Sequence, residues 1–72
     1  MNGTKTLYDR TSTQNVEYIG VAASGTDTTS PQWQIREITY SDDDNKIVSE
    51  LYANGSADYA FKWSERTTIT YS

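Results

Sequence analysis

Large apolar side chains concentrate between Gln32 and Ala53, in two runs that are interleaved with polar residues. These side chains are Trp33, Ile35, Ile38 and Tyr40 in the first run, and Ile47, Val48, Leu51 and Tyr52 in the second. Aromatic and β-branched residues suit a pleated, half-buried surface. The pattern predicts two strands joined by an acidic turn from Ser41 to Lys46, and we expect the core to nucleate on this hairpin.

In the first run, the apolar residues change from one face of the predicted strand to the other between Ile35 and Ile38; we call this change the phase slip. Alternation along a strand puts these residues on opposite faces in two pairs, Trp33 with Ile35 and Ile38 with Tyr40. One interpretation is a β-bulge near Arg36 and Glu37 that restores a single core face. The other is that both faces are covered, one by the core and one by a partner. The first needs no partner and is therefore preferred.

Upstream, the run from Asn15 to Ala23 predicts another strand. Its residues alternate between the two faces, with Val16, Tyr18 and Gly20 on one and Glu17, Ile19 and Val21 on the other. A glycine in mid-strand marks a bulge or a close backbone approach, which we expect at Gly20. Before this strand, residues 1–4 are expected to be loose, Thr4 to Tyr8 to form a short first strand, and Asp9 to Gln14 to form a turn.

The C-terminal third begins with Asn54-Gly55, the strongest tight-turn signal in the chain. In the following segment, Tyr59, Phe61 and Trp63 alternate as in a strand. The preferred alternative is a short helical turn near residues 58–64, capped by Asp58, that packs its aromatic rings over the sheet.

We expect Lys62 or Arg66 to form ion pairs with Asp58 or Glu65 in this part of the chain. The last run, Arg66 to Tyr71, is predicted to be a final strand.

These elements predict one all-β domain spanning residues 1–72, a small antiparallel sandwich or partly open barrel of four or five strands with one short helical turn. The residues expected to form the core or an assembly contact are Trp33, Ile35, Ile38, Tyr40, Leu51, Tyr52, Phe61, Trp63, Ile69 and Tyr71.

Composition limits how such a domain is stabilised. A chain of 72 residues with 35% hydrophobic residues has a small core, although two Trp and six Tyr make its side chains large. The absence of cysteine and histidine excludes disulfides and sites built on thiolate or imidazole. Oligomerisation is the remaining usual aid for a domain of this size, and we expect a homo-oligomer.

Charge and hydropathy narrow the partners further. The net charge of −4 disfavours a nucleic-acid binder, which needs a basic face. No apolar run reaches membrane-spanning length, and no signal peptide is recognised. We therefore expect neither a nucleic-acid nor a membrane partner.

The sequence offers little material for catalysis. Without histidine or cysteine, a carboxylate pair is the only acid–base chemistry available, and nothing brings two of Glu17, Glu37, Glu50 and Glu65 together. We expect solvated surface glutamates, no catalytic residue and no cofactor. The chain is therefore not expected to be an enzyme.

Two weaker site signals each have a plainer explanation. Asp42, Asp43 and Asp44 are weak calcium candidates, but their spacing departs from the usual calcium loop and any exposed turn favours aspartate. The rings of Tyr59, Phe61 and Trp63 fit a sugar-stacking platform, but in a chain with few aliphatic residues we expect them in the core.

The order of short motifs is familiar. It runs Tyr18-Ile19-Gly20, a Thr-rich loop, Trp33-Gln34-Ile35-Arg36, Ile38-Thr39-Tyr40, an acidic turn, Ala53-Asn54-Gly55, a segment with Trp63 and Arg66, and Thr70-Tyr71-Ser72. From about Tyr18 onward the chain resembles short β-rich, virion-associated structural proteins of tailed bacteriophages. It departs from them at Ala60, Lys62 and Ser64, where they carry more acidic residues.

The resemblance implies a virion component made in the bacterial host cytoplasm, either a capsid decoration or cement protein or a small part of the tail or neck. Its partners would be itself, other virion proteins, or both. Two other hypotheses are a small carbohydrate- or host-surface-binding module, and a phage-encoded inhibitor that masks a host protein.

Overall fold

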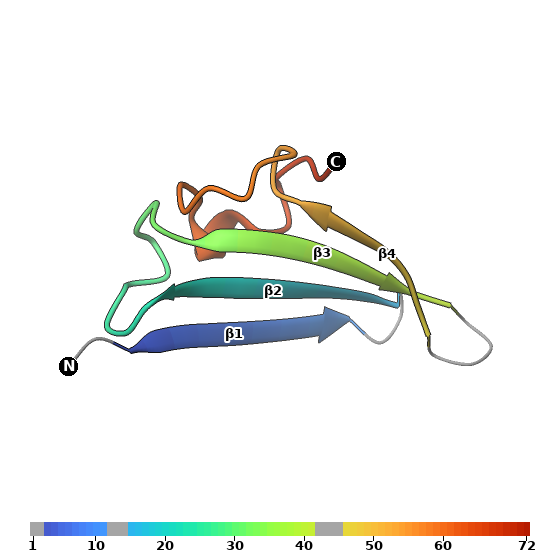
Figure 1. Cartoon of the computed structure of the whole chain (residues 1–72), viewed down its shortest axis with the longest axis horizontal. Coiled ribbons are helices and arrows are strands. Elements are labelled where there is room, and N and C mark those ends of the chain that lie inside the picture. Colours follow the sequence, from blue (N-terminus) through green and yellow to red (C-terminus); the bar gives the residue numbers. More distant parts are fainter. Residues whose placement is uncertain (1–2, 12–14, 42–45) are drawn as a thin grey trace.

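The computed structural model describes residues 3–11, 15–41 and 46–72 and is all-β, as predicted (Figure 1). The strands are β1 (Thr4–Thr11), β2 (Val16–Ala23), β3 (Gln34–Tyr40) and β4 (Ile47–Tyr52), and a 3-10 turn, η1 (Trp63–Glu65), follows them. They form one antiparallel sheet in the order β1-β2-β3-β4, which is not closed into a barrel. In the described residues, no helix is long and apolar enough to cross a membrane.

The first strand is longer than its sequence predicts. β1 pairs with β2 along its whole length, from Thr4 opposite Ala23 to Thr11 opposite Val16. The predictions of a loose residue 4 and of a turn starting at Asp9 are therefore wrong. The partner strand satisfies the backbone of this polar run, and threonine has a high β propensity.

The predicted bulge near Arg36 and Glu37 is also wrong. β3 pairs with β2 in one continuous register from Gln34 to Thr39, so the apolar phase slip puts side chains on both faces of the sheet. Ile35 on one face and Ile38 on the other are 0% and 3% exposed. A register shift does occur between Thr39 and Tyr40, where β3 pairs with β4 and Val48 is the extra residue.

One face of the sheet, the covered face, lies under the C-terminal segment. Its buried cluster consists of Ala22, Trp33, Ile35, Ala53 and Trp63, with Leu7, Tyr18, Phe61, Ile69 and Tyr71 packed against it. In Figure 1 this segment, drawn in orange and red, passes behind the sheet. A core built on two indole rings lets a short chain bury a large apolar area with few residues.

Gly20 allows the segment to approach the sheet. A Cβ atom at this position would lie 2.6 Å from Cζ3 of Trp63 and 3.1 Å from Cε3 of Trp33. The predicted close approach is thus confirmed, and its cause is the packing of the Trp63 ring on the backbone of β2. The two indole rings also contact each other, with centroids 6.0 Å apart.

The C-terminal segment is mostly irregular. Asn54 and Gly55 both have positive φ angles, 52° and 71°, which confirms the predicted tight turn. Phe61 then forms a two-hydrogen-bond bridge with Trp33. The predicted helical turn follows as η1, but it begins only at Trp63. Its N-cap position is Lys62, which makes no side-chain cap bond, so the predicted cap by Asp58 is wrong.

The predicted last strand, Arg66 to Tyr71, does not form, apart from one bridge between Ala53 and Tyr71. Local bonds replace the strand. The amide and the hydroxyl of Thr68 both donate to the carbonyl of Glu65, and the Tyr71 hydroxyl donates to the carbonyl of Arg66. Such side-chain-to-backbone bonds compete with strand pairing.

The polar loop between β2 and β3 is fixed to the core. The indole N–H of Trp33 donates to the carbonyl of Asp27 at 2.8 Å, and the amide of Ser64 donates to the carbonyl of Thr28 at 2.9 Å. The loop thereby connects the start of β3 to η1.

Candidate interaction face

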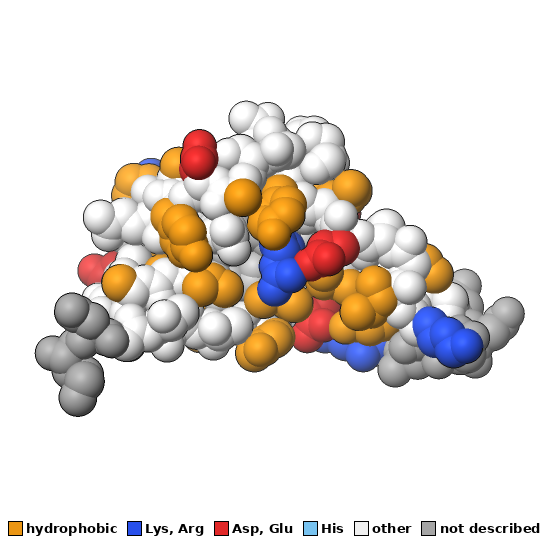
Figure 2. Space-filling model, in the orientation of Figure 1, with side chains coloured by type: hydrophobic (Ala, Val, Ile, Leu, Met, Phe, Trp, Pro, Cys, Tyr) orange, Lys and Arg blue, Asp and Glu red, His pale blue; other side chains and the backbone are white. Residues whose placement is uncertain are grey.

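The other side of the sheet, which we call the open face, is a four-stranded surface that the described C-terminal segment meets only at one end, where Gln34 Nε2 donates to the carbonyl of Ala57 and the Tyr59 ring lies. By strand register it contains Tyr8 and Arg10 of β1, Glu17, Ile19 and Val21 of β2, Arg36, Ile38 and Tyr40 of β3, and Ile47, Glu50 and Tyr52 of β4. Figure 2 shows hydrophobic side chains gathered over the strands on this side.

One cross-strand row runs through the centre of the open face. Tyr8 lies opposite Ile19, Ile19 opposite Arg36, and Arg36 opposite Tyr52. Residues directly opposite each other on one face are close enough to pack. The row therefore crosses all four strands, with Ile19 and Tyr52 on either side of Arg36 and Tyr8 beyond Ile19.

Several of these side chains are unusually exposed for their type. Tyr8 is 66% and Ile47 61% exposed, although both lie on strands. By contrast, Ile38 in the middle of this face is almost fully buried by its neighbours. Tyr8 on β1 and Ile47 on β4 therefore leave apolar area at both edges of this face available for a contact.

The charged groups of the open face form contacts with one another. Arg36 Nη1 bonds Glu50 Oε2, the Tyr40 hydroxyl donates to Glu17 Oε1 at 2.5 Å, and Arg10 lies 4.0 Å from the centre of the Tyr40 ring. The hydrogen bond to Glu17 raises the pKa of Tyr40 above its ordinary value. Because the face holds two arginines and two glutamates, its net charge is zero.

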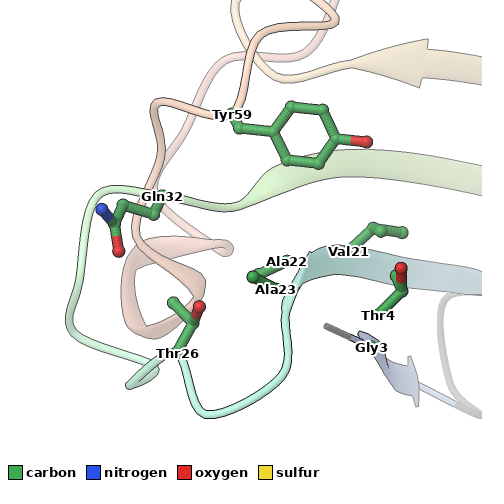
Figure 3. A pocket seen from close by; sticks show the side chains of 8 residues that line it. All are labelled: Gly3, Thr4, Val21, Ala22, Ala23, Thr26, Gln32 and Tyr59. Carbon is green, nitrogen blue, oxygen red and sulfur yellow. The ribbon is translucent and has the colours of Figure 1, made fainter. Parts of the chain in front are cut away.

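A shallow hollow of about 480 Å³ lies at the end of the sheet where β1 begins (Figure 3). It is lined by Gly3, Thr4, Val21, Ala22, Ala23, Thr26, Gln32 and Tyr59. No ionisable carboxylate or amine is among them, and the Tyr59 side chain is 56% exposed. The Tyr59 ring lies over this end of the sheet, where Gln34 Nε2 also donates to the carbonyl of Ala57.

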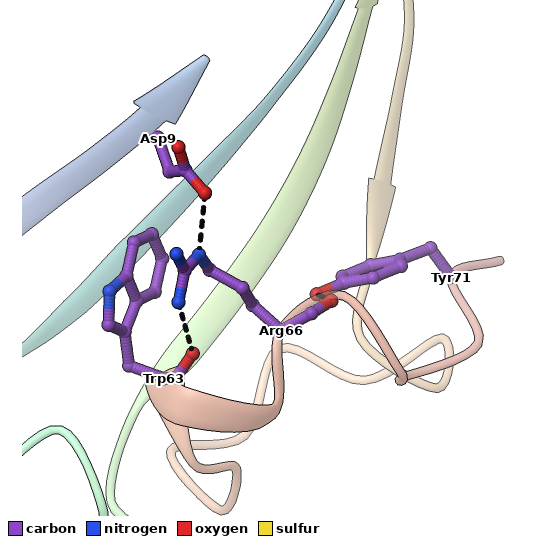
Figure 4. Close-up of polar contacts among 4 residues, drawn as sticks. All are labelled: Asp9, Trp63, Arg66 and Tyr71. Carbon is purple, nitrogen blue, oxygen red and sulfur yellow. Dashed lines mark hydrogen bonds and ion pairs between the residues drawn. The ribbon is translucent and has the colours of Figure 1, made fainter. Parts of the chain in front are cut away.

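A polar cluster on the covered face holds the C-terminal segment to β1 (Figure 4). Arg66 Nε donates to Asp9 Oδ2 at 2.8 Å, Nη1 donates to the carbonyl of Trp63 at 3.2 Å, and the guanidinium lies 4.7 Å from the centre of a Trp63 ring. The prediction that Arg66 pairs with Asp58 or Glu65 is therefore wrong. Its partner comes from a strand 57 residues away.

Two tyrosines lie beside this cluster, with ring centroids 5.6 Å apart. Burial is the main cause that raises the pKa of Tyr71 far above its ordinary value, and the nearby Tyr18 and Glu37 raise it further. Burial, followed by Glu37 and Asp9, also raises the pKa of Tyr18. Both phenols are therefore neutral donors or packing groups at physiological pH.

The residues predicted to form the core or an assembly contact divide between the two faces. Those on the covered face are Trp33, Ile35, Leu51, Phe61, Trp63, Ile69 and Tyr71. Those on the open face are Ile38, Tyr40 and Tyr52. Phe61 and Trp63, which also suited a sugar platform, belong to the core, whereas Tyr59 is at the surface.

The calcium candidates Asp42, Asp43 and Asp44 lie outside the described residues. Within the described part of the chain, no group of three or more acidic residues is placed to hold a metal ion. Of the four glutamates considered for acid–base chemistry, Glu17 is bonded to Tyr40 and Glu50 to Arg36.

The sequence interpretation missed Tyr8, Ile19 and Val21 as parts of one surface. The available signal was the phase slip in β3, which allowed a partner on the second face. A bulge would explain the same pattern without a partner, but β3 pairs with β2 without one. Pairing along the full length of β1 also aligns Tyr8 with Ile19, which a strand ending at Tyr8 did not suggest.

Comparison of the chain with protein-family models, with curated proteins and with solved structures found no match.

Proposed function

We propose that this chain is a non-enzymatic structural protein that acts by assembly, with the open face as its contact surface. The observation that carries the proposal is the apolar character of both faces of the sheet, of which the C-terminal segment covers one. Burying apolar surface contributes about 25 cal/mol per Å², so covering exposed residues such as Tyr8 and Ile47 favours association.

The proposed setting is the virion of a tailed bacteriophage, as a capsid decoration or cement protein or a small tail or neck component. Support for this setting comes from the motif resemblance from about Tyr18 onward. Small size and contact by surface burial alone suit a subunit that docks repeatedly on a lattice. Its partners would be itself, other virion proteins, or both.

Mass spectrometry of particles purified from the virus that encodes the chain tests this function. We expect the protein in stoichiometric amounts, together with its loss from particles when Tyr8→Glu places a charge on the open face. Thr67→Glu adds the same charge at an exposed position on the C-terminal segment and serves as the control. Absence of the wild-type protein from particles, or equal incorporation of both variants, contradicts the proposal.

A second candidate function, a carbohydrate-binding module, is favoured by the hollow beside Tyr59. An exposed aromatic ring beside amide and hydroxyl groups, with no charged side chain in the lining, suits a neutral sugar. NMR titration with methyl glycosides and short chito- and malto-oligosaccharides tests it. Binding should disappear in Tyr59→Ala and persist in Tyr8→Ala, which removes an equally exposed tyrosine elsewhere. No shift with any of these sugars rejects this candidate.

A further inference from the structure

The described C-terminal segment packs on the opposite face of the sheet, where Trp63 lies against Gly20, and it reaches the open face only near Ala57 and Tyr59. Tyr8 and Ile47 on the open face remain 66% and 61% exposed. A partner that covers them has to match the chemistry of this face.

The charge of the open face restricts that chemistry. Arg10 and Arg36 balance Glu17 and Glu50, and Arg36 is already paired with Glu50. The chain as a whole carries −4, so its excess negative charge lies outside this surface. A strongly acidic or basic partner would find no complementary field here, whereas a neutral apolar surface would meet no like-charge repulsion.

Size is the second restriction. Viewed face-on, the molecule extends 41 by 23 Å, and the sheet fills only part of that outline, so the open face offers less than about 900 Å². Specific interfaces bury about 800 Å² on each partner. A stable contact therefore has to use nearly all of the open face, which requires a partner surface that is equally broad and gently twisted.

We propose that the occupant is the open face of a second copy of this chain, so that two sheets pack face to face as a symmetric dimer. This inference rests on the proposed function and names the partner. The second copy supplies a surface that is neutral, apolar, of equal area and of the same twist. In a two-fold contact each residue pair occurs twice, so the match is self-complementary.

The dimer has a defined architecture. Two sheets packed face to face are about 10 Å apart, with strand directions about 30° from parallel. The result is a sandwich of two four-stranded sheets, flanked on both outer sides by the C-terminal segments. In this arrangement Tyr8, Ile19, Ile47 and Tyr52 become core residues.

Sedimentation equilibrium from about 1 μM to about 1 mM protein tests the inference. We expect a dimer that dissociates on dilution, and the double variant Tyr8→Glu/Ile47→Glu should weaken it by about 100-fold or more because like charges would be buried together. Both side chains are largely exposed in one chain, so the variant should keep its fold, as far-UV circular dichroism can show. Thr67→Glu should dimerise like the wild type.

The location of the contact is tested separately. In a mixture of isotope-labelled and unlabelled chains, we expect intermolecular NOEs from the methyl groups of Ile19, Val21 and Ile47. A monomer throughout the concentration range overturns the inference but leaves the proposed function intact, because incorporation into particles is measured independently. A dimer that tolerates the double variant, or that lacks these NOEs, overturns the face-to-face arrangement.

Discussion

On one face of the sheet, the C-terminal segment lays the ring of Trp63 against Trp33 and Gly20; on the other, Tyr8 and Ile47 have no described segment above them. Both faces are built from the same strands, and β3 contributes a buried isoleucine to each. The difference lies in coverage. The covered face supplies the stability of the chain, and the open face has apolar area left for association.

Two arginines show the same contrast. Arg66, on the covered side, is held by Asp9, by the carbonyl of Trp63 and by the Trp63 ring. Arg36, in the centre of the open face, contacts Glu50, while its buried Nε has no hydrogen-bond partner among the described residues. A buried donor without a partner costs free energy. The covered face is thus the more completely satisfied of the two in the single chain.

The largest expected effect comes from Trp63→Ala. Removing a buried tryptophan costs about 3–5 kcal/mol, and a domain of this size has roughly 4–11 kcal/mol of stability in total. The free energy of unfolding, measured by urea titration, should fall by about 3–5 kcal/mol. A matched removal on the open face, Tyr8→Ala, should change it by less than about 0.5 kcal/mol at concentrations where the chain is a monomer. Equal losses would mean that the two faces do not differ as described.

Gly20→Ala should have the next largest effect. The added methyl group would overlap the Trp63 ring, and overpacking of this kind costs about 1–3 kcal/mol. Thermal unfolding measures the loss. Gly25→Ala is the control for a loop glycine, since a Cβ there meets nothing within 4 Å, although its φ of 88° adds some backbone strain. A smaller loss at Gly20 than at Gly25 would contradict the close packing.

Substituting Arg66 or Arg36 by methionine tests the same difference between the two faces, with smaller expected changes in stability. Arg66→Met should cost about 1 kcal/mol, because it removes partly exposed contacts and leaves Asp9 without its partner. Arg36→Met should change the stability by less than about 0.5 kcal/mol, since the lost ion pair is offset by removal of the unpartnered Nε. Denaturant midpoints of the two variants decide the order, and the reverse order would be inconsistent with this account.

The smallest and most gradual difference concerns alkaline pH. Burial raises the pKa of Tyr71, so folding favours its neutral form. Its contribution is therefore complete below the unfolded pKa near 10, and is lost as pH rises through the higher folded pKa. Stability should stay level from neutral pH to about 9 and fall above about 10. In Tyr71→Phe, the fall in the free energy of unfolding above about pH 10 should be shallower. If the variant loses stability at alkaline pH as steeply as the wild type, other groups cause the loss.

Local sequence alone determined a good part of this molecule. Runs of β-branched and aromatic residues predicted β2, β3 and β4, because such side chains suit a pleated, half-buried surface. Asn54-Gly55 determined its turn through the positive φ angles that these residues adopt readily. Gly20 indicated a close approach to the backbone of β2. The phase slip in β3 showed that apolar residues lie on both faces of the sheet.

Only the tertiary structure decided the length of β1, the path of the C-terminal segment and the division into a covered and an open face. β1 extends past Tyr8 because β2 supplies backbone partners up to Thr11, which no local pattern in a polar run reveals. Arg66 pairs with Asp9 because the segment crosses the sheet and brings together groups 57 residues apart. Propensity acts between chain neighbours, whereas coverage of a face depends on where a distant segment packs, and that is decided by the fold as a whole.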